Sequence, residues 1–277
     1  MQHTHSSRLV SVVLALVGAF ALAACGSSTP PLTESEQEIF DRVKETAQER
    51  SALNYTELDE DAELEMNTKL VVNPANDSET SLSVDATILG DADTQLLHMT
   101  VDSKMQGARS NSAHTVMYGQ IDGDSMTLYS DEYGSWQSQV VSLDSLNLSG
   151  QDVDPADLLD YLFNLQDVTV TSDKDSYTIS GKISPDVLAE LFRESGDLDI
   201  DGGSAELTVT ADASSYQVFE LTLDVSIDVS TEGESAHMTI EVELVGQRDA
   251  NVDLEIPAEV LEAAGTAGAA DSSSSDN

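Results

Sequence analysis

Residues 63–72 read Glu-Leu-Glu-Met-Asn-Thr-Lys-Leu-Val-Val, and this stretch decides the fold of the chain. The side chains at its every second position are Leu64, Met66, Thr68, Leu70 and Val72. A period of two is typical of a β-strand, because successive side chains point to opposite faces of a sheet. We therefore predict a strand with one mainly apolar face.

The same period returns several times before residue 137. The later members are Leu82, Val84, Ala86, Ile88, Leu97, Met99, Val101, Met105, Val116, Tyr118, Met126, Leu128 and Trp136. Turn residues separate the sets at 73–77 and 90–93, and Ile121-Asp122-Gly123-Asp124 is a tight hairpin signal. Six strands joined by such short turns predict an antiparallel meander with one apolar face and one face of Asp, Ser and Thr.

Helix signals interrupt the strands in the second half of the chain. Asp154-Pro155 and Ser184-Pro185 each predict a helix start. The expected apolar sides of these two helices are Leu158, Leu159, Leu162 and Phe163, then Val187, Leu188, Leu191 and Phe192. Strands are expected at 168–171, 177–183, 207–211, 218–230 and 237–245, followed by an extended piece at 252–256.

A further helix is predicted before the meander. Thr33-Glu34-Ser35-Glu36 is a capping box, in which a Thr hydroxyl and a Glu carboxylate pair with the first free N–H groups of a helix. The apolar side chains that follow at helical spacing are Ile39, Phe40, Val43 and Ala47. We expect this helix to run to about Arg50 and to lay its apolar stripe on a sheet.

Together these segments predict an α+β fold, in which a large curved antiparallel sheet carries helices packed on its apolar concave face. We expect one domain over residues 33–261, with two half-domains meeting near residue 150 as the alternative. Residues 262–277 are rich in Ala, Ser and Asp and lack apolar anchors, which predicts a disordered acidic tail.

The start of the chain reads as a signal peptide over residues 1–24. It has one cation, Arg8, then an apolar run from Leu9 to Leu22, then small residues. The ending Leu22-Ala23-Ala24-Cys25 is similar to the lipobox of bacterial lipoproteins, which implies that the Cys25 thiol receives a diacylglyceryl group. An ordinary signal peptide followed by an incidental Cys is the alternative. Residues 25–32 are then a flexible tether, and the protein is expected outside the cytoplasm, lipid-anchored to the bacterial cell membrane.

The charge of the chain limits its partners. With 11 Lys and Arg against 52 Asp and Glu, the net charge is −41. Nucleic acid binding needs clustered cations and is excluded. Anionic head groups repel such a surface, so membrane attachment must come from the acyl chains on Cys25. Cys25 is the only Cys, so no disulfide forms within the chain and an apolar core must stabilise it.

Several segments resemble the LolA/LppX-like superfamily of envelope lipoproteins (LppX/LprG-type), and more closely an uncharacterised Gram-positive lipoprotein family on that plan. They are Cys25, the Met-bearing stretches 64–72 and 97–105, the segment Tyr129–Trp136 and the ending Val252–Pro257. The resemblance implies a half-barrel sheet closed by helices around an apolar cavity. It also implies that the cavity carries or senses lipids or acyl chains.

Methionines on the predicted apolar strand faces suit a cavity for variable acyl chains, because Met is flexible and polarisable. The alternative is that Met fills gaps between sheet and helices. The candidate ligand-binding residues are Leu64, Met66, Leu82, Val84, Leu97, Met99, Val101, Met126, Leu128 and Trp136.

Catalytic and metal motifs are weak in this sequence. His98, His114 and His237 read as strand histidines on the exposed polar face, and neither a nucleophile motif nor a metal spacing accompanies them. We expect neither enzyme activity nor a cofactor. The run Asp197-Leu198-Asp199-Ile200-Asp201-Gly202 matches the first half of a calcium loop, but Thr208 stands where the loop needs Glu. An acidic solvated turn is the default interpretation, with Asp197, Asp199 and Asp201 as a weak metal candidate.

The sequence thus favours a membrane-anchored lipoprotein that binds or carries a lipid or another hydrophobic ligand between sheet and helices. The alternative is a structural or regulatory envelope lipoprotein with a filled core, which acts through protein contacts.

We predict that Cys25→Ser removes the membrane anchor. The acidic surface offers no electrostatic attraction to anionic lipid, so the acyl chains supply the affinity, at about 0.8 kcal/mol per buried CH₂. Fractionation of expressing cells should move the variant out of the lipid-modified membrane fraction, while Ser27→Ala stays there. Unchanged acylation and membrane retention of Cys25→Ser would contradict the anchor.

Overall fold

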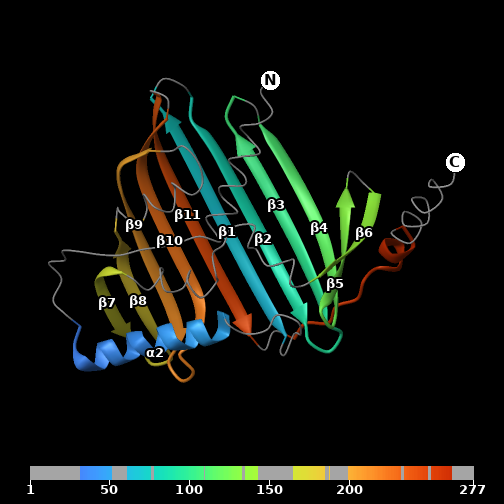
Figure 1. Ribbon diagram of the computed structural model, residues 1–277, viewed down its shortest axis with the longest axis horizontal. Helices are drawn as coiled ribbons and strands as arrows, with labels where there is room; N and C mark the ends of the chain where they lie inside the picture. Colours follow the sequence, from blue (N-terminus) through green and yellow to red (C-terminus); the bar gives the residue numbers. More distant parts are fainter. Residues whose placement is uncertain are drawn as a thin grey trace.

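A computed structural model describes residues 32–51, 61–75, 78–108, 110–132, 135–142, 165–184, 187, 199–231, 234–248 and 251–263. In these ranges eleven strands form one antiparallel sheet (Figure 1). The strands are β1 (Ala62–Pro74), β2 (Thr80–Asp91), β3 (Leu96–Gln106), β4 (Asn111–Asp122), β5 (Ser125–Glu132), β6 (Ser135–Ser142), β7 (Gln166–Ser172), β8 (Ser176–Ile183), β9 (Asp199–Asp212), β10 (Val218–Thr231) and β11 (Glu234–Arg248). Cys25 and the predicted signal peptide lie outside the described residues.

The strand order is β6-β5-β4-β3-β2-β1-β11-β10-β9-β8-β7. The first six strands form the predicted meander, which is confirmed. The last five strands form a second meander, which begins with β7 at the opposite edge of the sheet and ends with β11 at the centre. The two meet at the centre, where β1 and β11 pair without a break from Ala62–Arg248 to Pro74–Ala236. Both halves of the chain therefore share one continuous sheet.

The predicted α+β class, with helices packed on a concave face, is wrong. The structure is one large open antiparallel sheet, and besides the single helical residue Val187 its described residues contain two helices, α2 (Glu34–Ser51) and a short helix at 258–263. In Figure 1 α2 crosses one end of β7 to β10, so it covers a corner of the sheet instead of forming a layer. Neither helix has the length and hydrophobicity needed to cross a bilayer.

The reason for the error is that capping signals mark where helices begin, not how much of the sheet they cover. The helices predicted after Asp154 and Ser184 lie outside the described residues, apart from Val187, which is helical and buried. Strands of 14 and 15 residues at β9, β10 and β11 instead dominate the second half of the chain.

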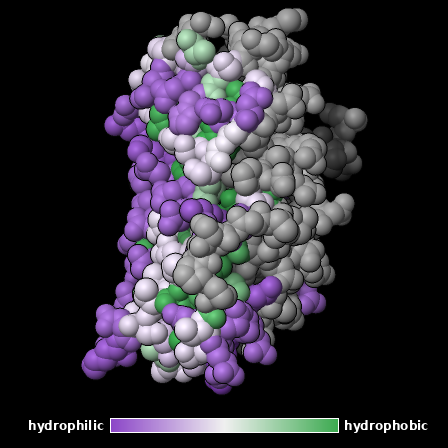
Figure 2. Space-filling view, turned by 90° about the vertical axis from the view of Figure 1, so that its left-hand side faces the viewer, coloured by the Kyte–Doolittle hydropathy of each residue, from purple (hydrophilic) through white to green (hydrophobic). Residues whose placement is uncertain are grey.

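Antiparallel pairing carries one face straight across all the strands, because paired residues point to the same side. On the apolar face, Leu70 of β1 pairs with Ile240 of β11, which pairs with Val225 of β10. These three side chains belong to a buried core under β7 to β11 that also includes Val43 of α2. Figure 2, seen from the β7 side, shows hydrophilic residues along one edge of the molecule, with patches of hydrophobic residues next to them toward the middle of the view.

The predicted capping box is confirmed at the start of α2. The Thr33 hydroxyl accepts a hydrogen bond from the Glu36 N–H at 3.3 Å, and the Glu36 carboxylate accepts one from the Thr33 N–H at 2.7 Å. The Thr33 hydroxyl donates to that same carboxylate at 2.6 Å. These hydrogen bonds lower the pKa of Glu36. The apolar stripe of the helix then packs on the core through Ile39, Phe40, Val43 and Ala47.

The predicted hairpin between β4 and β5 is also confirmed. Asp122 pairs with Ser125, so the loop holds only Gly123 and Asp124. Gly123 has a φ of 57°, a left-handed conformation that glycine adopts without the steric cost of a Cβ.

We predict that Thr33→Ala weakens the first turn of α2 by about 1 kcal/mol, because the N-cap hydroxyl and its partner are lost. Hydrogen exchange of the first-turn amides should speed up accordingly. Thr46→Ala, which removes a Thr hydroxyl further along α2 and outside the capping box, is the matched control and should leave the exchange of the first-turn amides close to that of the native chain. Equal exchange in both variants would show that the capping box contributes nothing.

Candidate functional site

Nine of the ten predicted ligand-binding residues share the apolar face of β1 to β5. Leu64 of β1 pairs with Ile88 of β2, which pairs with Met99 of β3, and all lie on one side. The neighbouring row contains Met66, Ala86 and Val101. The nine residues on this face are Leu64, Met66, Leu82, Val84, Leu97, Met99, Val101, Met126 and Leu128.

Trp136 does not belong with them, and its predicted place on this face is wrong. It pairs with Asp131, which is an odd number of residues from Leu128 along β5 and so points to the opposite face. Its ring lies 5.8 Å from that of Tyr118, centroid to centroid. Tyr118 and Val116 were assigned to the apolar series too, but Met117 occupies that face of β4 instead.

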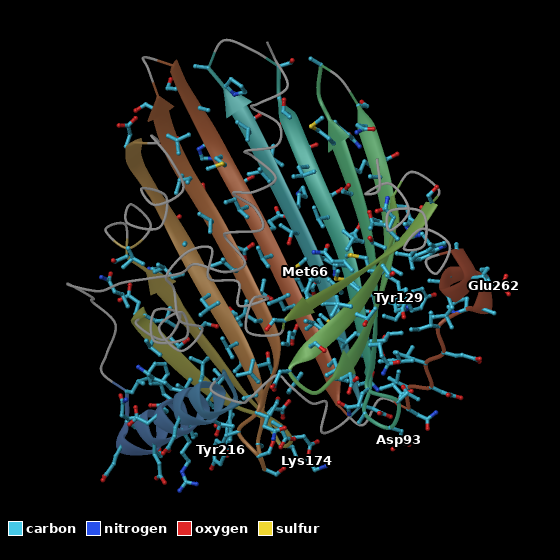
Figure 3. The ribbon with its side chains drawn as sticks, turned by 45° about the vertical axis from the view of Figure 1, so that its right-hand side comes forward. Met66, Asp93, Tyr129, Lys174, Tyr216 and Glu262 are labelled. Atoms are coloured by element: carbon cyan, nitrogen blue, oxygen red, sulfur yellow. The ribbon has the colours of Figure 1, made fainter. Side chains whose placement is uncertain are left out.

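Burial differs between the two halves of the apolar face, although the side chains of Leu70, Val84, Ala86, Ile121 and Met126 on β1 to β5 are buried as well. On the side of β7 to β11, Leu223 is 1% exposed and Ile227 is fully buried. On the side of β1 to β5, Leu64 is 36% exposed, and Met66 and Met99 are half-buried. We call the first region the filled half and the second, β1 to β5, the open half. Figure 3 places Met66 in the middle of the sheet, near the boundary between them.

Thr68 stands out on the apolar face because it is polar and buried. It is 4% exposed, and its Oγ1 finds no hydrogen-bond partner in the described part of the protein. Its neighbours across the ladder are Val84 on β2 and Val242 on β11, both buried. A buried hydroxyl between two valines is a feature that hydrophobic patterning alone does not require.

The polar face carries a second, smaller hydrophobic cluster that sequence reasoning missed. His98 stacks on Tyr118 with ring centroids 4.8 Å apart, and Tyr118 is next to Trp136. Burial lowers the pKa of His98 and, with the carboxylate of Glu259, raises the pKa of Tyr118. The buried members are Leu96, Ile256 and Val260, with Tyr118, Tyr129, Trp136 and Leu254 packed against them.

Residues 252–260, which we call the C-terminal strap, cover this cluster. The Leu254 N–H donates a hydrogen bond to the Asp91 carboxylate at 2.9 Å, and Thr94 donates to its other oxygen at 3.1 Å. These bonds lower the pKa of Asp91. Asp61 accepts in the same way from the Val252 N–H at 3.4 Å. Figure 3 shows Tyr129 and Glu262 on this same side of the sheet.

A signal for the cluster was present in the sequence. Tyr118, Tyr129 and Trp136 share the face opposite to Met117 and Leu128, which a strict count of alternation reveals. The alternating residues of the strap, Val252, Leu254 and Ile256, offer a complementary apolar edge.

The polar face also brings two histidines next to carboxylates. His114 Nδ1 lies 2.9 Å from Asp102, and His237 Nδ1 lies 2.9 Å from Asp228. Ser226 Oγ lies 3.4 Å from Nε2 of His237, so the order of groups is that of a charge relay. Both pairs are exposed cross-strand neighbours, and the Ser–His contact is long for a hydrogen bond that activates a nucleophile. We assign no catalytic role to either histidine pair.

The weak calcium candidate lies only partly in the described residues. Asp197 is outside them, while Asp199 and Asp201 belong to β9. Here the pairing between β9 and β10 shifts, because Asp228 pairs with Gly202 but Val229 pairs with Ile200. The backbone at Asp201 is therefore part of a bulged strand and not of a loop. Within the described ranges, no group of three or more potential ligands is placed to hold a metal ion.

Comparisons with known proteins add little. No family model and no curated protein matches the chain. Among solved structures, a DUF1329 family protein from Desulfovibrio piger aligns at 8% identity with a TM-score of 0.22, over 80% of this chain and 96% of that one. The assignment of a function therefore depends on the chain itself.

We predict that acid releases the C-terminal strap. Because the folded state lowers the pKa of Asp91, its carboxylate stabilises the folded strap above the ordinary Asp pKa, and that contribution is lost as the pH falls through the lowered value. Trp136 is the only Trp, so its emission reports on the cluster beneath the strap. We expect a red shift below about pH 4.

Asp91→Ala should give that red shift already at neutral pH. Asp93→Ala, an exposed carboxylate in the same turn, is the matched control and should keep the native spectrum. Native emission from Asp91→Ala at neutral pH would contradict the role of this carboxylate.

Proposed function

We propose that the protein is an extracytoplasmic lipoprotein, anchored through Cys25, that binds a lipid or another hydrophobic ligand on the open half of its apolar face. The observation that carries the proposal is the contiguous set of partly exposed apolar side chains on neighbouring strands. They are Leu64, Met66, Ile88, Leu97, Met99, Val101, Met117 and Leu128.

Such a set needs an explanation in a chain with a net charge of −41, whose surface is otherwise strongly hydrated. Contiguous apolar patches on a protein surface commonly mark an interaction site. Here three of the eight residues are Met, whose flexible thioether adapts to chains of different shape. The filled half has its own core, to which the open half contributes Leu70 of β1 and, packed against it, Val72 and Leu82.

The same patch is compatible with a second function. Val43, Leu207 and Ile240 belong to a core filled by side chains, as expected of an envelope lipoprotein that acts through protein contacts. In that case the open half would bury against a partner protein and would hold no ligand. A test must therefore separate a small hydrophobic ligand from a protein surface.

Native mass spectrometry of the full lipidated chain, released from detergent micelles, makes this separation. We expect a mass shift from a co-purifying lipid beyond the anchor. A diazirine-labelled long-chain ester should then crosslink to peptides of β1 to β5.

Met99→Glu places a charge on the open half and should reduce crosslinking at least tenfold, which is about 1.4 kcal/mol. The adjacent Thr100→Glu places the same charge on the polar face and should leave crosslinking unchanged. Circular dichroism must show that both variants fold. No mass shift, with label spread evenly over both faces, would favour the protein-contact alternative.

A further inference from the structure

The unpartnered hydroxyl of Thr68 points to a second property of the open half. Elsewhere in this sheet, hydroxyls find acceptors across the strands. Thr169 and Thr171 each donate to a backbone carbonyl of β8 at 3.5 Å, and Ser180 lies 3.0 Å from the Thr208 hydroxyl. Thr68 is more deeply buried than these residues, at 4% exposure, yet its Oγ1 has no partner in the described ranges.

Leaving a buried hydroxyl unpaired costs more than an ordinary hydrogen bond returns, so such a group in a native protein needs a reason. Valine has nearly the same shape and would fit the row, because Val84 and Val242 flank the position on either side. The sequence nevertheless places Thr there. Packing therefore does not explain the hydroxyl, and a hydrogen-bond partner that arrives with a ligand does.

The position of Thr68 fits that explanation. Leu70, two residues further along β1, belongs to the core of the filled half, whereas Met66, two residues back, is half-buried on the open half. Thr68 thus lies where the two halves meet. Because Thr68 is only 4% exposed without a ligand, the end of a bound ligand would reach its hydroxyl only where neighbouring side chains move aside.

We propose that Thr68 Oγ1 donates a hydrogen bond to a neutral carbonyl oxygen of the ligand, so that the open half selects acyl esters over plain hydrocarbons. This inference rests on the proposed function. A carboxylate is disfavoured because the neighbours of Thr68 on the ladders, Val84 and Val242, are apolar and carry no charge that could compensate a buried negative charge. A hydrocarbon would leave the hydroxyl unpaired.

The test compares two probes of equal chain length on the full lipidated protein in micelles, a diazirine-labelled fatty acid methyl ester and the matching labelled hydrocarbon. In the native chain the ester should bind more tightly. Thr68→Val should weaken the ester by about two- to tenfold and leave the hydrocarbon unchanged. Its thermal stability without probe should equal or exceed that of the native chain, because an unpaired hydroxyl is removed.

Two further variants make the result decisive. Thr68→Ser keeps the hydroxyl and should keep the preference for the ester, while Thr100→Val removes a hydroxyl from the polar face and should change neither affinity. If neither probe binds the native chain, the proposed function and this inference both fail. If both probes bind and Thr68→Val weakens them equally or not at all, only the role of Thr68 is overturned.

Discussion

The two-residue period, carried in register across eleven antiparallel strands, is the constraint on which the rest of this structure depends. The central ladder between β1 and β11 joins two meanders, so a residue near the start of the chain and one near its end share a face. Every apolar side chain of that parity is then added to the same surface. A sheet this wide presents more apolar area than the stripe of one helix such as α2 can cover.

The two parts of the apolar face therefore differ in how deeply their side chains are buried. Under β7 to β11 the side chains of Leu207, Leu223 and Ile227 are excluded from solvent, which gives the molecule its main hydrophobic stabilisation. Arg42 of α2 lies 5.2 Å from the centroid of the Tyr216 ring, which stacks on Tyr177, and this contact fixes the helix against the end of the sheet. Stability is thus concentrated on one side, whereas several apolar side chains of the open half stay partly exposed.

Local signals in the sequence predicted local structure well. The Thr33–Glu36 capping box, the Gly123 hairpin and the strands of both meanders follow from spacing within a few residues, where turn chemistry and alternation act directly. The fold class did not follow, because the extent to which helices cover a sheet depends on packing between distant segments. Trp136 was placed on the wrong face because one residue of parity reverses a whole strand.

Contacts between residues far apart in the sequence could not be predicted, for the same reason. The hydrogen bond from Leu254 to Asp91 spans 163 residues, and no local pattern identifies its partners. The nine apolar candidates were found because alternation alone assigns their face. The unpartnered hydroxyl of Thr68 could not be predicted, because a Thr in an alternating strand is unexceptional until its surroundings are known.

The two faces also explain how an acidic chain can keep an apolar surface. The polar face places the exposed carboxylates Glu241, Asp224 and Glu206 side by side on β11, β10 and β9, with Lys69 Nζ 3.0 Å from Glu241 at one end of the row, so water solvates this face. The smaller hydrophobic cluster on that face, which includes Tyr118, Tyr129 and Trp136, is covered by the C-terminal strap of the same chain. The open half then presents a group of partly exposed apolar side chains, whereas Val140 of β6 and Phe219 of β10 are single exposed residues elsewhere on the sheet. At the boundary of the open half, Thr68 is the residue that we propose distinguishes one hydrophobic ligand from another, because a hydrogen bond is directional and apolar contact is not.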